Sequence, residues 1–272
     1  MAFNTCVFYY DGVSSEEYGL YYYEIGNNTQ NAGSINNGFS VVSDTVSRRY
    51  QPIHYGVQKS DHMEFDMVFG SLKFLSRREI EEIAKWLTGR STFAPLVVDD
   101  GDMAGVQYKA IITSMDQIQY DGLTIAFKAH VVCDSPFAYT ESIHIAHQCD
   151  GEYSFHFTNL SNLPEMYAPD VMIELKSGED FKMENKTTGE IVSFEFGGAN
   201  TSDIQLYIFG KTKVLKYTSE DETLVLNLYD YMKLNGEKHF VFPRFFMGDN
   251  LVTVTGECVV HITSEFPLQL GY

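Results

Sequence analysis

The sequence is poor in the residues that build disulfide frameworks and membrane spans. It has four cysteines, one tryptophan and no long apolar run among 272 residues. Cys6, Cys133, Cys149 and Cys258 are widely spaced and form no Cys-x-x-Cys pair, which argues against a disulfide framework and predicts reduced thiols. No stretch approaches the roughly 20 apolar residues of a membrane span, and the N-terminus lacks a signal-peptide pattern. We therefore expect a soluble protein made in a cytoplasm.

Positive charge is also scarce. The chain has 19 Lys and Arg residues against 37 Asp and Glu residues, which gives a net charge of -18. No basic stripe interrupts this acidity, so a protein that grips a phosphate backbone is not indicated. The acidity favours solubility, or alternatively a surface that repels nucleic acid. Arginine is typical of interfaces, and five of the six arginines lie before residue 139: Arg48, Arg49, Arg77, Arg78 and Arg90.

Catalytic and metal-binding motifs are missing too. There is no Gly-x-Ser-x-Gly elbow and no phosphate-binding glycine loop, and the carboxylates are too scattered to define the acid–base pair of a glycosidase. His144, His147 and Cys149 look like half of a metal site, but no second ligand cluster accompanies them, so we interpret them as linker residues. The acidic segment Asp99–Asp102 lacks the spacing of a calcium loop. We predict no enzyme activity, no metal and no cofactor.

One amphipathic helix is present, and the predicted helix spans residues 76–88. Ser76 and Glu79 fit the capping box, in which each residue satisfies a free backbone donor at the helix start. Gly89 follows as a stop signal. The apolar residues share one stripe at helical spacing, with Trp86 near its edge: Ile80, Ile83, Ala84 and Leu87. A helix of about three turns is marginal alone, so it must dock on a sheet.

The rest of the chain has the period-two alternation of strands, which predicts a mainly β fold in two domains, 1–139 and 140–272. Before the boundary, Cys6–Tyr10 and Tyr18–Glu24 read as a strand pair, and Asp121-Gly122 predicts a tight hairpin turn. The polar segment Gly26–Gly38 cannot bury itself, so it is either disordered in the isolated chain or ordered by a partner.

Beyond the boundary, at least six short strands with turn signals between them predict a β-sandwich. The alternating sets are Tyr153/Phe155/Phe157, Val171/Ile173/Leu175, Val192/Phe194/Phe196, Ile204/Leu206/Ile208, Leu224/Leu226/Leu228 and Cys258/Val260/Ile262.

Three stretches together resemble the distal tail proteins of long-tailed, non-contractile bacteriophages. The first is the helix, from the charged start at Arg77-Arg78 to Trp86-Leu87. The second runs from Ala94-Pro95-Leu96 to the closing pattern Phe127 to Tyr139, and it is the most specific. The third is Phe242-Pro243 with Gly248-Asp249-Asn250. These stretches cover nearly the whole chain, and none of them is a catalytic signature.

The resemblance implies a structural protein of the virion, made in the host cytoplasm. It implies a six-fold homo-oligomeric ring of N-terminal domains between the tail tube protein and the tip hub, which is a tail-associated lysin or fibre protein. A galectin-like C-terminal domain would face outward and hold receptor-binding or other adhesion proteins. DNA would pass through the ring without specific binding, and an acidic wall suits that passage.

We predict that the subunit interface draws on the polar loop and on arginines of the first domain. The candidate residues are Asn27, Asn28, Asn31, Asn36, Asn37, Arg48, Arg49, Arg77 and Arg78. Two other functions remain open. One is a carbohydrate-binding module that recognises host cell-wall glycans, and the other is a β-sandwich hydrolase with two carboxylates in a cleft.

Overall fold

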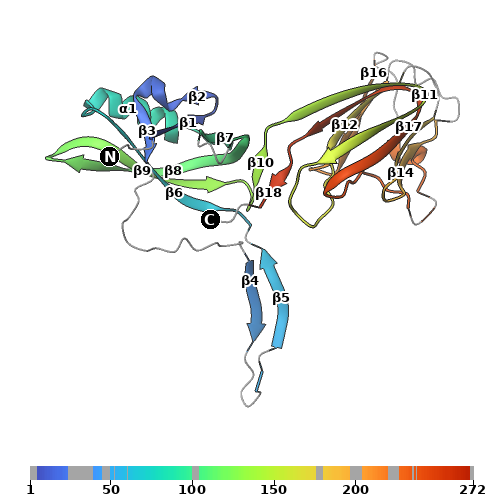
Figure 1. The fold of residues 1–272 in the computed structure, drawn as a ribbon, viewed down its shortest axis with the longest axis horizontal. Coiled ribbons are helices and arrows are strands. Elements are labelled where there is room, and N and C mark those ends of the chain that lie inside the picture. The colour runs from blue at the N-terminus through green and yellow to red at the C-terminus, as the bar shows by residue number, and fades with distance from the viewer. Residues whose placement is uncertain are drawn as a thin grey trace. The chain divides into compact units, whose positions relative to one another are not determined.

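The computed structural model describes residues 5–23, 39–44, 50–51, 53–59, 61–99, 104–175, 180–196, 204–219, 227–234, 236 and 238–269. These residues form 18 strands, two α-helices and one 3-10 turn, so the predicted mainly β fold class is confirmed. The chain divides into two compact units (Figure 1). The first is Met1–Thr140 with Leu268–Tyr272, and the second is Glu141–Pro267.

The first unit is built on a closed antiparallel barrel with one helix. Its elements are β1 (Thr5–Tyr10), β2 (Val13–Ser14), η1 (Ser15–Tyr18), β3 (Leu20–Tyr23), β6 (Glu64–Ser71), α1 (Arg77–Thr88), β7 (Ala94–Asp99), β8 (Val106–Tyr120), β9 (Leu123–Cys133) and β10 (Ala138–Thr140). The strand order is β8-β7-β1-β3-β6-β9, and β9 pairs again with β8, which closes the circuit. β18 (Pro267–Leu268) and β10 extend the sheet beyond β8, while β4 (Phe39–Asp44) and β5 (Ile53–Lys59) form a separate two-stranded sheet.

Helix α1 follows its local signals closely. Ser76 is the N-cap, and both hydrogen bonds of the predicted capping box with Glu79 are present. Gly89 is the C-cap residue, but its φ of -77° is not the left-handed conformation that usually ends a helix at glycine. The apolar side of α1 joins the barrel core, in which Phe8, Phe69 and Phe127 are fully buried.

The hairpin of β8 and β9 turns at the predicted dipeptide. Asp121 and Gly122 both have positive φ, 51° and 76°, as a two-residue type I′ turn requires. The alternation of side chains in β9 does not continue unchanged to its start, because the register shifts between Ile118 and Gln119. Such a bulge resets the alternation of side chains between the two faces. Thr124 is therefore buried, whereas Leu123 is exposed.

The first strand pair is more elaborate than the sequence indicated. The turn at Asp11-Gly12 leads into the two-residue strand β2, which pairs with the end of β1. The 3-10 turn η1 then separates β2 from β3, and β3 pairs with the start of β1. Gly19 ends η1 in the left-handed conformation, which glycine adopts without steric cost.

The second unit is a single seven-stranded sheet that forks at one strand. Its elements are β11 (Ile143–Asn159), β12 (Asp170–Leu175), β13 (Phe181–Asn185), β14 (Glu190–Phe194), β15 (Ile204–Phe209), β16 (Val214–Ser219), α2 (Leu228–Tyr231) and β17 (Gly248–Ser264). β17 pairs along its whole length with β11. On its other edge it pairs first with β13 and then with β12, so β13-β14 and β12-β15-β16 diverge from one strand.

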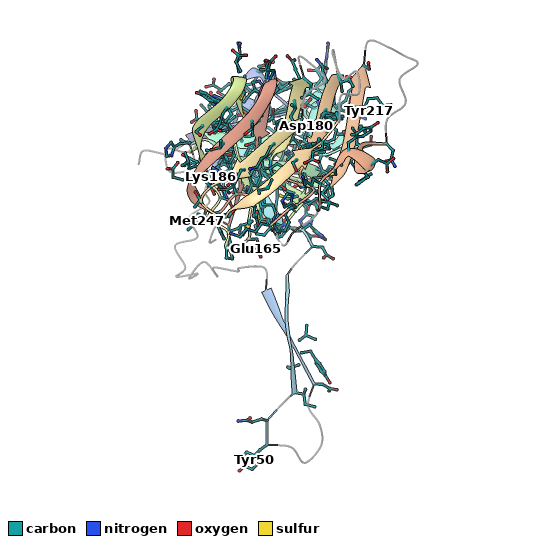
Figure 2. All side chains as sticks on the ribbon, turned by 90° about the vertical axis from the view of Figure 1, so that its right-hand side faces the viewer. Tyr50, Glu165, Asp180, Lys186, Tyr217 and Met247 are labelled. Carbon is teal, nitrogen blue, oxygen red and sulfur yellow. The ribbon has the colours of Figure 1, made fainter. Side chains whose placement is uncertain are left out.

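Two glycines mark the fork. Gly151 of β11 lies opposite Gly256 of β17, and both have φ values that other residues rarely adopt, 103° and 132°. Gly256 also lies against the carbonyl oxygen of Asp180, which is labelled in Figure 2, and a Cβ there would come within 2.8 Å of it. The buried residues on both sides of the fork belong to one core, which includes Val254 and Cys258.

Two sequence predictions for the second unit are corrected. Leu228 was expected to end a strand, but it begins the short helix α2, and residues 224–226 lie outside the described part of the chain. His144, His147 and Cys149 were expected in a linker, but they lie within the long strand β11. β11 runs on from these residues through Tyr153, so the strand predicted at Tyr153–Phe157 is the second part of one long strand.

We predict that Gly256→Ala destabilises the second unit more than Gly151→Ala does. Both substitutions strain the backbone, which costs about 1–3 kcal/mol. Only the Cβ at residue 256 also collides with a backbone atom, because the space at Gly151 is open. Chemical denaturation of the two variants measures the difference in the free energy of unfolding, and equal losses would show that the contact with Asp180 is unimportant.

Candidate assembly surfaces

The outer face of α1 carries two of the arginines predicted at a subunit interface. Arg77 and Arg78 are almost fully exposed, at 94% and 88%, and they pair with Glu81 and Glu82 one turn along the helix at 3.1 and 3.0 Å. Exposed pairs at this spacing contribute only a few tenths of a kcal/mol. The guanidinium groups therefore remain available to other acceptors at little cost to the fold.

The inner face of α1 is fixed by Trp86. Its ring stacks on Tyr18 and on Phe8, with centroid distances of 4.6 and 5.8 Å. Its Nε1 donates a hydrogen bond to the backbone oxygen of Tyr10 at 3.3 Å. Trp86 is only 9% exposed, so this tryptophan is a packing residue of the core. Because the inner face is locked in this way, the outer face of α1 is presented in one orientation.

The start of α1 is held by charge as well as by the cap. Lys73 donates to Oε1 of Glu79 at 2.8 Å, and the backbone nitrogen and hydroxyl of Ser76 donate to Oε2. The ammonium of Lys73, followed by the two bonds from Ser76, lowers the pKa of Glu79 from 4.5 to about 2. These interactions fix the approach to the helix, which holds the exposed side chains Leu72 and Phe74.

Four large apolar side chains are exposed around the β8–β9 turn, and we name them the hairpin-tip patch: Leu72, Phe74, Tyr120 and Leu123. Tyr120 and Leu123 lie directly opposite each other in the register, so they share one face of the hairpin. The backbone nitrogen of Leu75 donates to the oxygen of Thr124 at 2.9 Å, which places the segment with Leu72 and Phe74 beside the start of β9. Leu72 is 79% exposed and Tyr120 is 68% exposed. Grouped apolar exposure of this kind is typical of an interaction surface.

The second unit also has a group of four exposed apolar side chains, near the start of β17. We name it the β17-start patch: Leu160, Phe246, Met247 and Leu251. All four side chains are exposed. The pairing of Asn159 with Gly248 brings the residues that flank this point together. Figure 2 shows Met247 toward the same end of the second unit as Glu165, which agrees with the bridge between Tyr167 and Phe245.

Most of the predicted interface residues lie outside the described residues. These are Asn27, Asn28, Asn31, Asn36, Asn37, Arg48 and Arg49, together with the rest of the segment Gly26–Gly38. Tyr50, which follows Arg49 in the sequence, is exposed (Figure 2). Tyr55 is exposed as well. In the part of the chain that the structure describes, no three or more His, Cys, Asp or Glu side chains are grouped to hold a metal ion. No described helix is long and apolar enough to cross a membrane.

Comparison with known proteins identifies the class of the first unit. Residues 3–135 match the family described as the phage tail protein N-terminal domain. That part of the chain is therefore similar to the N-terminal domains of bacteriophage tail proteins. A search of curated proteins found no match.

The fold of the whole chain is similar to a particular tail protein. The crystal structure of Dit from phage SPP1 superposes with a TM-score of 0.61 at 12% sequence identity, covering 96% of this chain and 99% of that one. That protein is described as a paradigm of the hub adsorption apparatus in phages that infect Gram-positive bacteria. The resemblance to distal tail proteins that the sequence suggested is thus confirmed.

We predict that Glu79→Gln destabilises the first unit at neutral pH but not in acid. The pKa of Glu79 is lower in the folded chain than its ordinary value of 4.5, so its contribution is fully present above that value and is lost as the pH falls toward about 2. Unfolding of both proteins between pH 7 and about pH 3 checks this. Glu81→Gln, which breaks only the exposed pair with Arg77, is the matched control and should show no such convergence. A Glu79→Gln effect independent of pH would contradict the prediction.

Proposed function

We propose that this chain is the structural subunit of a ring at the tip of a phage tail, without enzyme activity. The observation that carries the proposal is the joint match of the first unit to a tail-protein family and of nearly the whole fold to SPP1 Dit. In this proposal the two units are separate domains, and the second is a galectin-like β-sandwich. The protein is then part of the virion and is made in the host cytoplasm.

The first unit would form the ring, which we propose to be a hexamer that joins the tail tube protein to the tip hub. Its closed barrel leaves few free strand edges, so neighbours would meet through side-chain surfaces. The hairpin-tip patch and the exposed Arg77 and Arg78 on α1 offer such a surface on a rigid support. In a ring, each copy is related to the next by rotation about the ring axis. The next copy would therefore contact this surface through a different patch of its own, and such heterologous contacts close into rings.

The second unit would face outward and hold adhesion proteins. Its β17-start patch exposes four apolar side chains that are not part of the buried core of that unit. The net charge of -18 supports the passage of DNA through the ring without binding, because an acidic wall does not trap phosphates.

Light scattering on a sizing column, followed by negative-stain microscopy, tests the proposed assembly. The expected result is a closed ring of six subunits with a central hole, formed either by the chain alone or on addition of the tail tube and hub proteins. A protein that stays monomeric in the presence of both would contradict the proposal. Screening that monomer against cell-wall glycans would then test the carbohydrate-binding alternative.

We predict that the double variant Arg77→Ala/Arg78→Ala loses ring formation while its thermal unfolding temperature stays within a few degrees of wild type. The expected change in fold stability is small because both arginines form only exposed pairs. The matched control is Lys182→Ala/Lys186→Ala, which removes two charges from the second unit that pair with Glu184. Rings formed equally well by both double variants would exclude the arginines from the interface.

A further inference from the structure

The outer face of the second unit brings two histidines from neighbouring strands together. His144 lies on β11 opposite Thr263 of β17. His261 lies on β17 two residues before Thr263, on the same face of the sheet. The two imidazole rings stack with centroids 5.5 Å apart at an angle of 23°. Nε2 of His144 lies 3.4 Å from Nδ1 of His261. Two imidazole nitrogens, each able to bind a metal ion, therefore face each other on a partly exposed surface.

The separation of these nitrogens fits a shared tetrahedral ion. Two nitrogens that each lie about 2.05 Å from zinc are about 3.3–3.4 Å apart at the tetrahedral angle, and about 2.9 Å apart at a right angle. The observed 3.4 Å matches the tetrahedral value. Imidazole nitrogen is a ligand that zinc prefers, and zinc imposes that geometry more often than nickel or copper(II) does.

Each of the remaining ring nitrogens lies near a polar group. Nδ1 of His144 is 3.1 Å from the hydroxyl of Thr263. Nε2 of His261 is buried, has no hydrogen-bond partner among the described residues, and lies 3.6 Å from Oε1 of Glu174. Nδ1 is therefore the nitrogen of His261 that faces His144. In metal-bound histidines the second nitrogen likewise lies near a polar group.

The charges around the pair also favour a cation. β12 carries Asp170, opposite Thr263, and Glu174, so two carboxylates lie on the same face of the sheet as the histidines. Across the sheet, His261 lies level with Met172, Tyr207 and Lys216 on the next three strands. Lys216 on β16 is the first cation along this line, and three strand spacings place it about 14 Å from β17. The whole chain adds a background of negative charge.

We propose that His144 and His261 form a two-nitrogen site for a zinc-class divalent cation. No third protein ligand completes it within the described residues, so its other positions are open to water or to a side chain of a bound molecule. The ion would tie the edge strand β11 to β17. This site does not depend on the proposed ring. The competing arrangement is a hydrogen-bond chain from Thr263 through His144 to Nδ1 of His261, which pairs these atoms without a metal.

Calorimetric titration of the full chain without an affinity tag, using zinc chloride alone, separates these two arrangements. The expected result is one zinc ion per chain and an unfolding temperature that rises with zinc concentration. His144→Gln and His261→Gln should each weaken binding more than tenfold. Glu174→Gln should weaken it about 10- to 100-fold by removing an orienting group.

The matched control is His156→Gln. This histidine also lies on β11, but its Nδ1 pairs with Asp249 at 2.7 Å and it is not part of the stacked pair. The variant should bind zinc as the wild type does. The proposal is overturned if the wild type binds no zinc at millimolar concentration, or if the variants at residues 144 and 261 bind it with unchanged affinity.

Discussion

The architecture of the first unit depends on the double pairing of β8. Its residues 108–110 pair with β7, while residues 110–120 pair with β9, so this one strand closes the barrel. Closure removes the free edges that would otherwise template unwanted strand pairing. It also encloses a core that strands alone do not complete, and α1 supplies Ile83, Trp86 and Leu87 to it. The exposed surfaces of α1 and of the hairpin tip are therefore fixed by the same closure.

In the second unit too, one long strand pairs with several neighbours, but the sheet stays open. β17 keeps one neighbour, β11, along its whole length but changes its other neighbour at Gly256. One long strand pair can then serve two diverging sets of strands around a single core. Because side chains alternate between faces, the residues of β11 and β17 that point away from the core form rows on the outer surface. The stacked pair of His144 and His261 is one consequence of that register.

The sequence predicts best what local interactions determine. The capping box at Ser76 and the turn at Asp121-Gly122 depend on neighbouring residues, and both are present as predicted. The bulge near Ile118 and the short strands β13 and β16 were missed. Each belongs to a hairpin of strands adjacent in the sequence, and β16 has no buried residue that would mark a core face. The histidine pair could not be predicted either, since its members are 117 residues apart and meet only through the register of β11 and β17. Of the predicted interface residues, Arg77 and Arg78 are described, and their exposure follows from the helical stripe.

Charge constrains how copies of this chain can associate. A net charge of -18 per subunit makes neighbours repel, so any ring must be held by short-range contacts. At physiological ionic strength the repulsion between exposed charges is screened beyond about 8 Å. Contacts that bury apolar side chains such as Leu72 and Tyr120 are not screened, and Arg77 and Arg78 supply local positive charge against an acidic neighbour. Assembly would then be weakest at low salt, where the acidic surfaces repel over longer distances while the apolar contacts are unchanged.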